Sequence, residues 1–204
     1  MLGLMQDWPL LCHRIIDHAA LNHGDRPVVS RSVEGPIHTT TYATIRARAL
    51  RVAKRLDRDG IRQGDRVATL GWNTWRHLEA WYGIVGVGAI YHTVNPRLFP
   101  DQIAWIVNHA EDKILFLDTT FVPTIEKVAG ELRTVKAYVI LTDREHMPAA
   151  SGLPGLLCYE GLLAEMSPEF EWPEFDENAA CALCYTSGTT GEPKGVLYSN
   201  RSMI

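Results

Sequence analysis

A short stretch near the C-terminus, residues 185–196, holds the residue types that bind a polyphosphate. Its hydroxyl-bearing residues, glycines and single lysine are Thr186, Ser187, Gly188, Thr189, Thr190, Gly191, Lys194 and Gly195. Glycine lets backbone N–H groups come close to a ligand, and successive N–H groups form a nest for anions. A lysine adds a positive charge suited to phosphate. The stretch therefore predicts a phosphate-binding loop in which Lys194 neutralises phosphate charge.

Two common phosphate-binding patterns differ from this one, and a flexible linker is the alternative. Two residues separate Gly191 from Lys194, whereas in a Walker A loop the lysine directly follows the glycine. The dinucleotide pattern GxGxxG does not fit either. A linker rich in Ser, Thr and Gly seldom has an apolar strand on each side, as this stretch has at 179–185 and 196–198. The phosphate loop is therefore the favoured interpretation.

Short apolar runs alternate with helical patterns between residues 65 and 141. We expect strands at 67–70, 89–94, 114–117 and 135–141, and helices at 73–85, 100–110 and 121–132. This order predicts an α/β fold, with a mostly parallel sheet and flanking helices. Its crossovers should be right-handed. The strand at 179–185 would then carry the phosphate loop at its end.

The segments on either side of these repeats have other patterns. Residues 1–64 predict a lead-in, with helices at 9–23 and 41–59 and a hairpin of strands at 27–31 and 37–40. The helix at 41–59 carries the cations Arg46, Arg48, Arg51, Lys54 and Arg55. They indicate either nucleic-acid or lipid binding or a solvated face, and the acidic chain favours the solvated face. Residues 142–178 predict a long connection with one short helix near 159–165.

Composition excludes several classes of protein. The 204 residues are 46% hydrophobic and 22% charged, with a net charge of −4. This composition is ordinary for a globular protein. It lacks the excess of basic residues that is typical of nucleic-acid-binding proteins. No apolar run approaches the roughly 20 residues of a membrane-spanning helix, and the first residues lack the basic region of a secretory signal. Four cysteines fit a reducing cytosol, so we expect a cytoplasmic protein.

Isolated cysteines, histidines and tryptophans favour packing over chemistry. Cys181 and Cys184 form a C-x-x-C in an apolar strand, with Cys12 and Cys158 isolated in the sequence, so buried free thiols are expected. His13, His18 and His23 recur every five residues, which is off the spacing that shares a helix face. They are expected at the surface or partly buried, without a metal. For His92, packing is the default. Trp72, Trp75 and Trp81 indicate core or an association face.

The sequence YTSGTTGEPKGV resembles the phosphate-binding signature of the AMP-forming acyl-CoA synthetase and adenylation superfamily. Residues 41–118 are similar to the N-terminal region of long- and medium-chain fatty-acyl-CoA synthetases. HTVNPRL and IAWIVNHAEDK are particularly close to the bacterial fatty-acid branch. The resemblance implies that 1–204 is the N-terminal portion of the AMP-binding domain, with the N-terminal part of the adenylate-forming fold. Its parts are then the lead-in 1–64, the βα repeats 65–141, the connection 142–178, and the strand, loop and following segment 179–204.

The resemblance also implies a two-step reaction. A carboxylate, such as a fatty acid, attacks the α-phosphate of ATP to give an acyl-adenylate and pyrophosphate, and the thiol of coenzyme A then displaces AMP. Residues 186–194 would clamp the β- and γ-phosphates, Thr186 would contact Mg²⁺, and Lys194 would be the catalytic cation. Asn200 would lie in the substrate vicinity. The family resemblance further implies a homodimer formed through the N-terminal region.

The chain departs from the family in two respects. Asn200 stands in Ser-Asn-Arg where the family usually has Ser-His-Arg, and asparagine cannot titrate near neutral pH. Family members are also much longer, so we expect an N-terminal portion that is inactive alone, with the adenine, ribose and acyl sites encoded downstream. The alternatives are a folded, non-catalytic fragment that serves association, or a ligase for a short or sulfur-bearing carboxylate such as methylmercaptopropionate.

Overall fold

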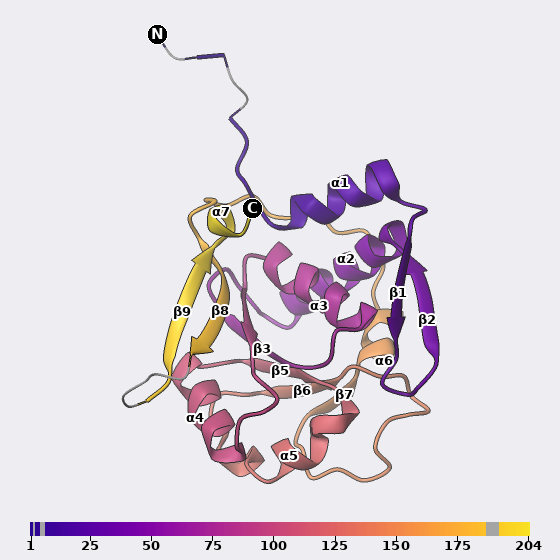
Figure 1. Cartoon of the computed structure of the whole chain (residues 1–204), viewed down its shortest axis with the longest axis vertical. Coiled ribbons are helices and arrows are strands. Elements are labelled where there is room, and N and C mark those ends of the chain that lie inside the picture. Colours follow the sequence, from indigo (N-terminus) through magenta and orange to yellow (C-terminus); the bar gives the residue numbers. More distant parts are fainter. Residues whose placement is uncertain (2, 5–6, 187–191) are drawn as a thin grey trace.

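A sheet lies at the centre of the molecule (Figure 1). The structure is a computed structural model and describes residues 1, 3–4, 7–186 and 192–204. In these residues seven strands form the sheet in the order β7-β6-β5-β3-β4-β8-β9, with all pairs parallel except β8 and β9. The strands are β3 Arg66–Leu70, β4 Ile90–Thr93, β5 Ile114–Leu117, β6 Ala137–Ile140, β7 Leu156–Cys158, β8 Ala180–Thr186 and β9 Lys194–Ser199. The predicted α/β class with a mostly parallel sheet is confirmed.

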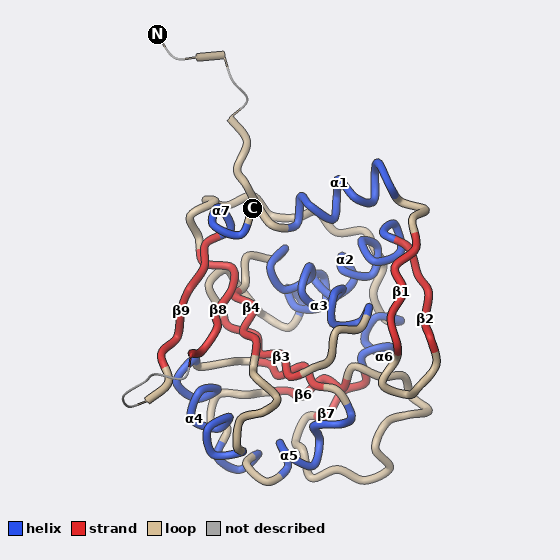
Figure 2. The backbone as a smooth tube through the Cα atoms, viewed as in Figure 1, coloured by secondary structure: helices blue, strands red, loops and turns tan. Residues whose placement is uncertain are grey.

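Helices cover both faces of this sheet, and a separate hairpin flanks it (Figure 2). The helices are α1 His13–His23, α2 Tyr42–Arg58, α3 Trp75–Gly86, α4 Pro100–Ala110, α5 Val122–Glu126, α6 Tyr159–Ala164 and α7 Asn200–Met203. The hairpin pairs β1 Pro27–Arg31 with β2 Ile37–Thr41. Along β5, Ile114 and Phe116 pack in a core with α2, α3 and α6, while Leu115 and Leu117 pack in a second core with α4 and α5. This alternation explains why the inner strands are apolar throughout.

Local sequence signals set most helix boundaries. Thr41 caps α2 by accepting a hydrogen bond from the backbone N–H of Thr44, and Thr74 caps α3 in the same way. Pro100 begins α4, where its missing N–H costs nothing. Gly60 follows α2 with a φ of 85°, a conformation that favours glycine. The predicted helices at 41–59 and 100–110 are therefore confirmed.

Three predicted elements were wrong in part because distant residues compete for their backbone. The first helix begins at His13 rather than at residue 9, since Glu177 and Asn200 accept hydrogen bonds from the N–H groups of residues 10 and 12. The helix expected at 121–132 is broken into α5 between two short 3₁₀ turns, Thr119–Phe121 and Ala129–Glu131. Here the Asn108 amide binds the carbonyl of residue 131 and the N–H of residue 133. The expected connection 142–178 also contains the three-residue strand β7.

The solvated cationic face expected on α2 was wrong, because its cations are half-buried and pair with other residues of the protein. Arg46 binds Asp17 at 2.5 Å, and Arg55 binds Asp59 at 2.7 Å. Arg48 is 21% exposed at its side chain and binds the fully buried Glu79 at 2.7 Å. Helix α6 and the segment after it pack on α2 and accept from Arg48, Arg51 and Lys54. These cations therefore join elements of the fold.

The expectation that His13 lies at the surface or is partly buried was wrong. His13 is 3% exposed, and its ring stacks on Trp172 with a centroid distance of 5.2 Å. Burial lowers the pKa of His13 to about 4. Trp75 lies in the core, whereas Trp72 is 48% exposed. Within the described ranges, no helix is long and apolar enough to cross a membrane.

Glu79 is expected to lower stability as pH rises. Burial outweighs the neighbouring Arg48 and raises the pKa of Glu79 from 4.5 to about 7. The folded protein then retains a proton that the unfolded chain releases, so the free energy of unfolding falls between pH 4.5 and about 7. Glu79→Gln keeps an acceptor for Arg48 and removes the titration. Relative to the parent protein, this variant should gain about 3 kcal/mol across that window.

Urea unfolding of both proteins at several pH values measures this difference. His13 acts in the opposite sense, because its lowered pKa makes the protein less stable as pH falls from 6.5 to about 4. The comparison is therefore between the two proteins at each pH, where the contribution of His13 cancels. Parallel pH profiles would contradict the assignment to Glu79.

Candidate phosphate-binding site

The described ends of the predicted phosphate loop face each other across the β8–β9 hairpin. Thr186 is the last residue of β8, Lys194 is the first of β9, and the two are register partners. The Thr186 hydroxyl donates to the Lys194 carbonyl at 3.5 Å. Both residues are exposed, so the Thr186 hydroxyl and the Lys194 ammonium are open to a ligand. Lys194 was expected in a loop; the exposure is confirmed, but its backbone belongs to a strand.

The remaining predicted loop residues lie outside the described residues. They are Ser187, Gly188, Thr189, Thr190 and Gly191, and their phosphate-binding role stays a prediction. The hairpin still fixes where this loop starts and ends. It lies at the carboxyl end of β8, which runs parallel to β4 (Figure 1). Ligands of open α/β sheets bind at the carboxyl ends of the parallel strands.

An aromatic cluster ties the end of β8 to helix α4. The Tyr185 hydroxyl lies 2.6 Å from His109 Nδ1, and the His109 ring stacks on Trp105 with centroids 4.7 Å apart. Gly195 on β9 makes room for this arrangement, because a Cβ there would lie 3.3 Å from Tyr185 Cζ and 3.1 Å from Leu183 Cδ1. The residue directly before Thr186 is thus held by hydrogen bonding, stacking and packing.

A buried His–Asp pair lies behind this cluster. His92 Nδ1 and Asp112 Oδ2 are 2.6 Å apart, and both side chains are fully buried. The His92 ring centroid is 5.2 Å from that of Tyr185. Burial raises the pKa of Asp112 above its ordinary value. The sequence predicted packing for His92, and its burial confirms this, but its carboxylate partner was missed because Asp112 gives no periodic signal.

Asn200 lies at the opposite end of the β8–β9 hairpin from Thr186 and Lys194 (Figure 1). It is 1% exposed. Its Oδ1 accepts from the backbone N–H of Cys12 at 3.1 Å, and its Nδ2 donates to the Ala179 carbonyl at 3.1 Å. The side chain therefore joins the N-terminal segment to the end of the sheet. Its placement near a substrate stays a prediction.

The cysteines are free thiols, as expected, but Cys184 is only half-buried and Cys12 is not isolated in space. Cys12 and Cys181 are buried, with their sulfur atoms 3.8 Å apart. Cys184 Sγ instead lies 3.1 Å from the Thr93 hydroxyl. The two cysteines of the C-x-x-C therefore contact different partners.

The α/β sheet and the Gly/Ser/Thr-rich sequence between β8 and β9 are the features that the comparisons with known proteins test. The AMP-binding enzyme family matches residues 16–204, and the chain belongs to this family. It is 47% identical over its full length to 3-methylmercaptopropionyl-CoA ligase of Ruegeria lacuscaerulensis, covering 38% of that protein. It is 45% identical to medium-chain-fatty-acid–CoA ligase of Ectopseudomonas oleovorans, again over its full length, covering 37% of it.

A solved structure supports the fold. The crystal structure of the anthranilate CoA ligase AuaEII in complex with anthranoyl-AMP superposes with a TM-score of 0.81 at 23% identity, covering 97% of this chain and 37% of that one. At this identity the likeness shows the fold alone. The chain thus spans less than two fifths of the length of the relatives named here.

Proposed function

We propose that this chain is the N-terminal, phosphate-binding portion of an AMP-forming acid–thiol ligase. The whole ligase would activate a carboxylic acid with ATP to an acyl-adenylate and transfer the acyl group to coenzyme A. The observation that carries the proposal is the pairing of Thr186 with Lys194 at the two ends of a Gly/Ser/Thr-rich loop. Membership of the AMP-binding enzyme family supports it.

In this proposal the loop holds the β- and γ-phosphates of ATP. Lys194 places its ammonium beside the departing pyrophosphate, where a fixed positive charge stabilises the negative charge that develops. The Thr186 hydroxyl is an exposed oxygen at the end of a strand, which suits Mg²⁺, an ion that takes oxygen ligands and usually binds together with substrate phosphates. When bound, Mg²⁺ would neutralise phosphate charge. Tyr185 and His109 would position the start of the loop.

The acyl substrate is proposed to be a fatty acid of medium or long chain. The similarity to medium-chain-fatty-acid–CoA ligase supports this class. The similarity to 3-methylmercaptopropionyl-CoA ligase, at 47% identity against 45%, supports a short, sulfur-bearing carboxylate as the second candidate. Both candidates use the same phosphate loop and the same chemistry at phosphorus, so they differ only in the acyl pocket.

A cytoplasmic homodimer is proposed for the assembled enzyme. Large apolar side chains are exposed in the lead-in, where Leu21 is 86%, Val29 61% and Ile37 64% exposed. Large apolar side chains exposed in this part of the chain are available for association with another protein surface. A second copy of the chain is the proposed partner.

Carboxylate-dependent ATP–pyrophosphate exchange tests the proposed reaction. The 204-residue chain is assayed with a panel that contains fatty acids of several lengths and methylmercaptopropionate. We expect no exchange from the folded chain alone and exchange from a longer polypeptide that contains it. Exchange by the chain alone, above a Lys194→Ala control, would show that it adenylates without further segments. A longer polypeptide that shows no exchange with any carboxylate would contradict the ligase and favour the non-catalytic fragment that serves association.

A further inference from the structure

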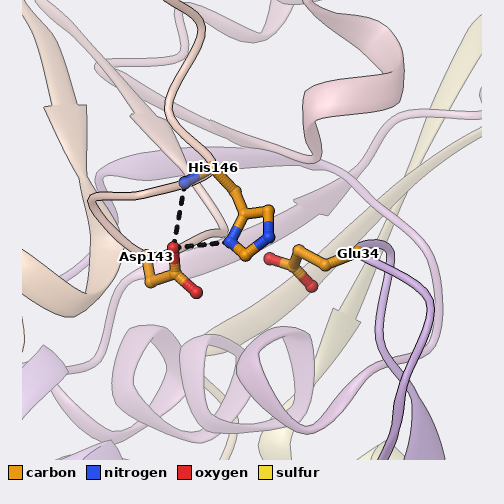
Figure 3. A group of neighbouring side chains, drawn as sticks. All are labelled: Glu34, Asp143 and His146. Atoms are coloured by element: carbon orange, nitrogen blue, oxygen red, sulfur yellow. Dashed lines mark hydrogen bonds and ion pairs between the residues drawn. The ribbon is translucent and has the colours of Figure 1, made fainter.

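A polar cluster lies between the β1–β2 hairpin and the segment that follows β6, away from the phosphate loop. It consists of Glu34, in the turn between β1 and β2, with Asp143 and His146 (Figure 3). Each residue offers one ligand atom, and these atoms all lie within 4.8 Å of one another. Residues from distant parts of the sequence thus present two carboxylates and an imidazole to one point.

Asp143 and His146 are held in place by the local backbone. Asp143 Oδ1 accepts from the backbone N–H groups of Glu145 and His146, each at 3.0 Å. The same oxygen lies 2.7 Å from His146 Nδ1. In Figure 3 the Glu34 carboxylate faces the imidazole of His146 from the side away from Asp143.

The Glu34 carboxylate supplies an independent indication of a ligand. Its side chain is 8% exposed. Oε1 accepts from Arg76 at 2.8 Å and from the Thr142 hydroxyl at 2.6 Å. Oε2 is buried and has no hydrogen-bond partner in the described part of the chain. A buried carboxylate oxygen left in this state is costly, and a cation beside it would remove that cost.

The surroundings have space and charge for a cation. The cluster lines a cavity of about 650 Å³ that also contains Arg48, Arg76 and Glu160. Both arginines are engaged, since each binds Glu160 and Arg76 also binds Glu34. Three carboxylates against two guanidinium groups leave one negative charge when His146 is neutral. Arg76 therefore fixes Glu34 through Oε1, and Oε2 stays without a partner among the described residues.

We propose that Glu34, Asp143 and His146 bind a divalent metal ion of the zinc type. One imidazole nitrogen and two carboxylate oxygens are ligands that Zn²⁺ accepts, with water in the fourth position. At metal–ligand distances of about 2.0–2.2 Å, ligand atoms lie roughly 3–4 Å apart. The ligand atoms that lie farthest apart would therefore approach one another, whereas His146 Nδ1 and Asp143 Oδ1, now 2.7 Å apart, would separate.

For Glu34 to reach a metal bound between His146 and Asp143, the exposed His146 ring and the Glu34 carboxylate must turn toward the same side. The proton now shared by His146 Nδ1 and Asp143 Oδ1 is released to solvent when the metal binds. The site would fasten the β1–β2 hairpin to the sheet.

Calorimetric titration of the metal-free protein with Zn²⁺ tests the site, with Co²⁺ absorption as the readout of ligand type. We expect one equivalent to bind to the parent protein, and His146→Gln to weaken binding at least 10-fold. His146 is exposed, so this variant should fold. Glu34→Gln tests the buried ligand, and Zn²⁺ should raise the Tm of the parent protein but not of His146→Gln.

The matched control is His23→Gln on helix α1. The exposed His18 and His23 rings lie 6.1 Å apart, so this pair is the alternative place where Zn²⁺ could bind. We expect His23→Gln to bind Zn²⁺ as the parent protein does. The proposal would be overturned by a parent protein that binds no Zn²⁺, by unchanged affinity in His146→Gln, or by loss of binding in His23→Gln.

Discussion

Lys194→Ala is expected to weaken binding of ATP and of pyrophosphate about 10- to 100-fold, since a hydrogen bond to a charged group contributes roughly 1.5–3 kcal/mol. The side chain is exposed, and Lys194 is held in the sheet through its backbone pairing with Thr186. Alanine keeps that pairing, so the fold should be retained. Calorimetry with each ligand, on the chain and on a longer polypeptide that contains it, measures the change.

The matched control for this variant is Lys127→Ala. Lys127 is also exposed, but it follows α5 and belongs to neither β8 nor β9. Its replacement removes the same charge from the molecule and should leave both affinities unchanged. Equal losses in the two variants would mean that net charge, and not the position of Lys194, determines binding. Equal affinities in Lys194→Ala and the parent protein would refute the role assigned to Lys194.

The sheet was predictable because its strands and helices carry strong local signals. The helix at Pro100–Ala110 and the strand at Ile114–Leu117 have the predicted bounds, since Pro100 sets the start of the helix and four apolar residues form the strand. The strand at Leu156–Cys158 was missed because three half-buried residues give no period to detect. Its pairing with β6 is a tertiary interaction.

The candidate site was predictable only where residue type carries the chemistry. Glycines, hydroxyls and a lysine mark residues 186–194 in the sequence itself. The groups that hold its start, His92 with Asp112 and Tyr185 with His109, come together only through the sheet and α4. Likewise, the sequence near α2 contains no signal that α6, more than a hundred residues later, packs on the cations of α2. These cations were therefore predicted to be solvated.

Arg76→Met is expected to lower the free energy of unfolding by about 3–5 kcal/mol, the range found when one partner of a buried ion pair is removed. Arg76 is 6% exposed. It binds Glu34 at 2.8 Å, Glu160 at 2.8 Å and the Leu141 carbonyl at 3.3 Å. Methionine fills a similar volume but leaves the Glu34 carboxylate buried without its cation. Thermal unfolding should shift downward by roughly 6–20 °C.

Arg58→Met separates this effect from the loss of an ordinary ion pair. Arg58 binds Glu165 at 3.4 Å, and both side chains are 53% exposed, so its removal should cost at most about 1 kcal/mol. The double variant Arg76→Met with Glu34→Gln supplies the second control. Because Gln carries no charge, part of the stability lost in Arg76→Met should return. If the double variant is less stable than Arg76→Met by the full cost of Glu34→Gln, the two residues do not interact. The Arg76–Glu34 ion pair then does not help to hold the β1–β2 hairpin to the sheet.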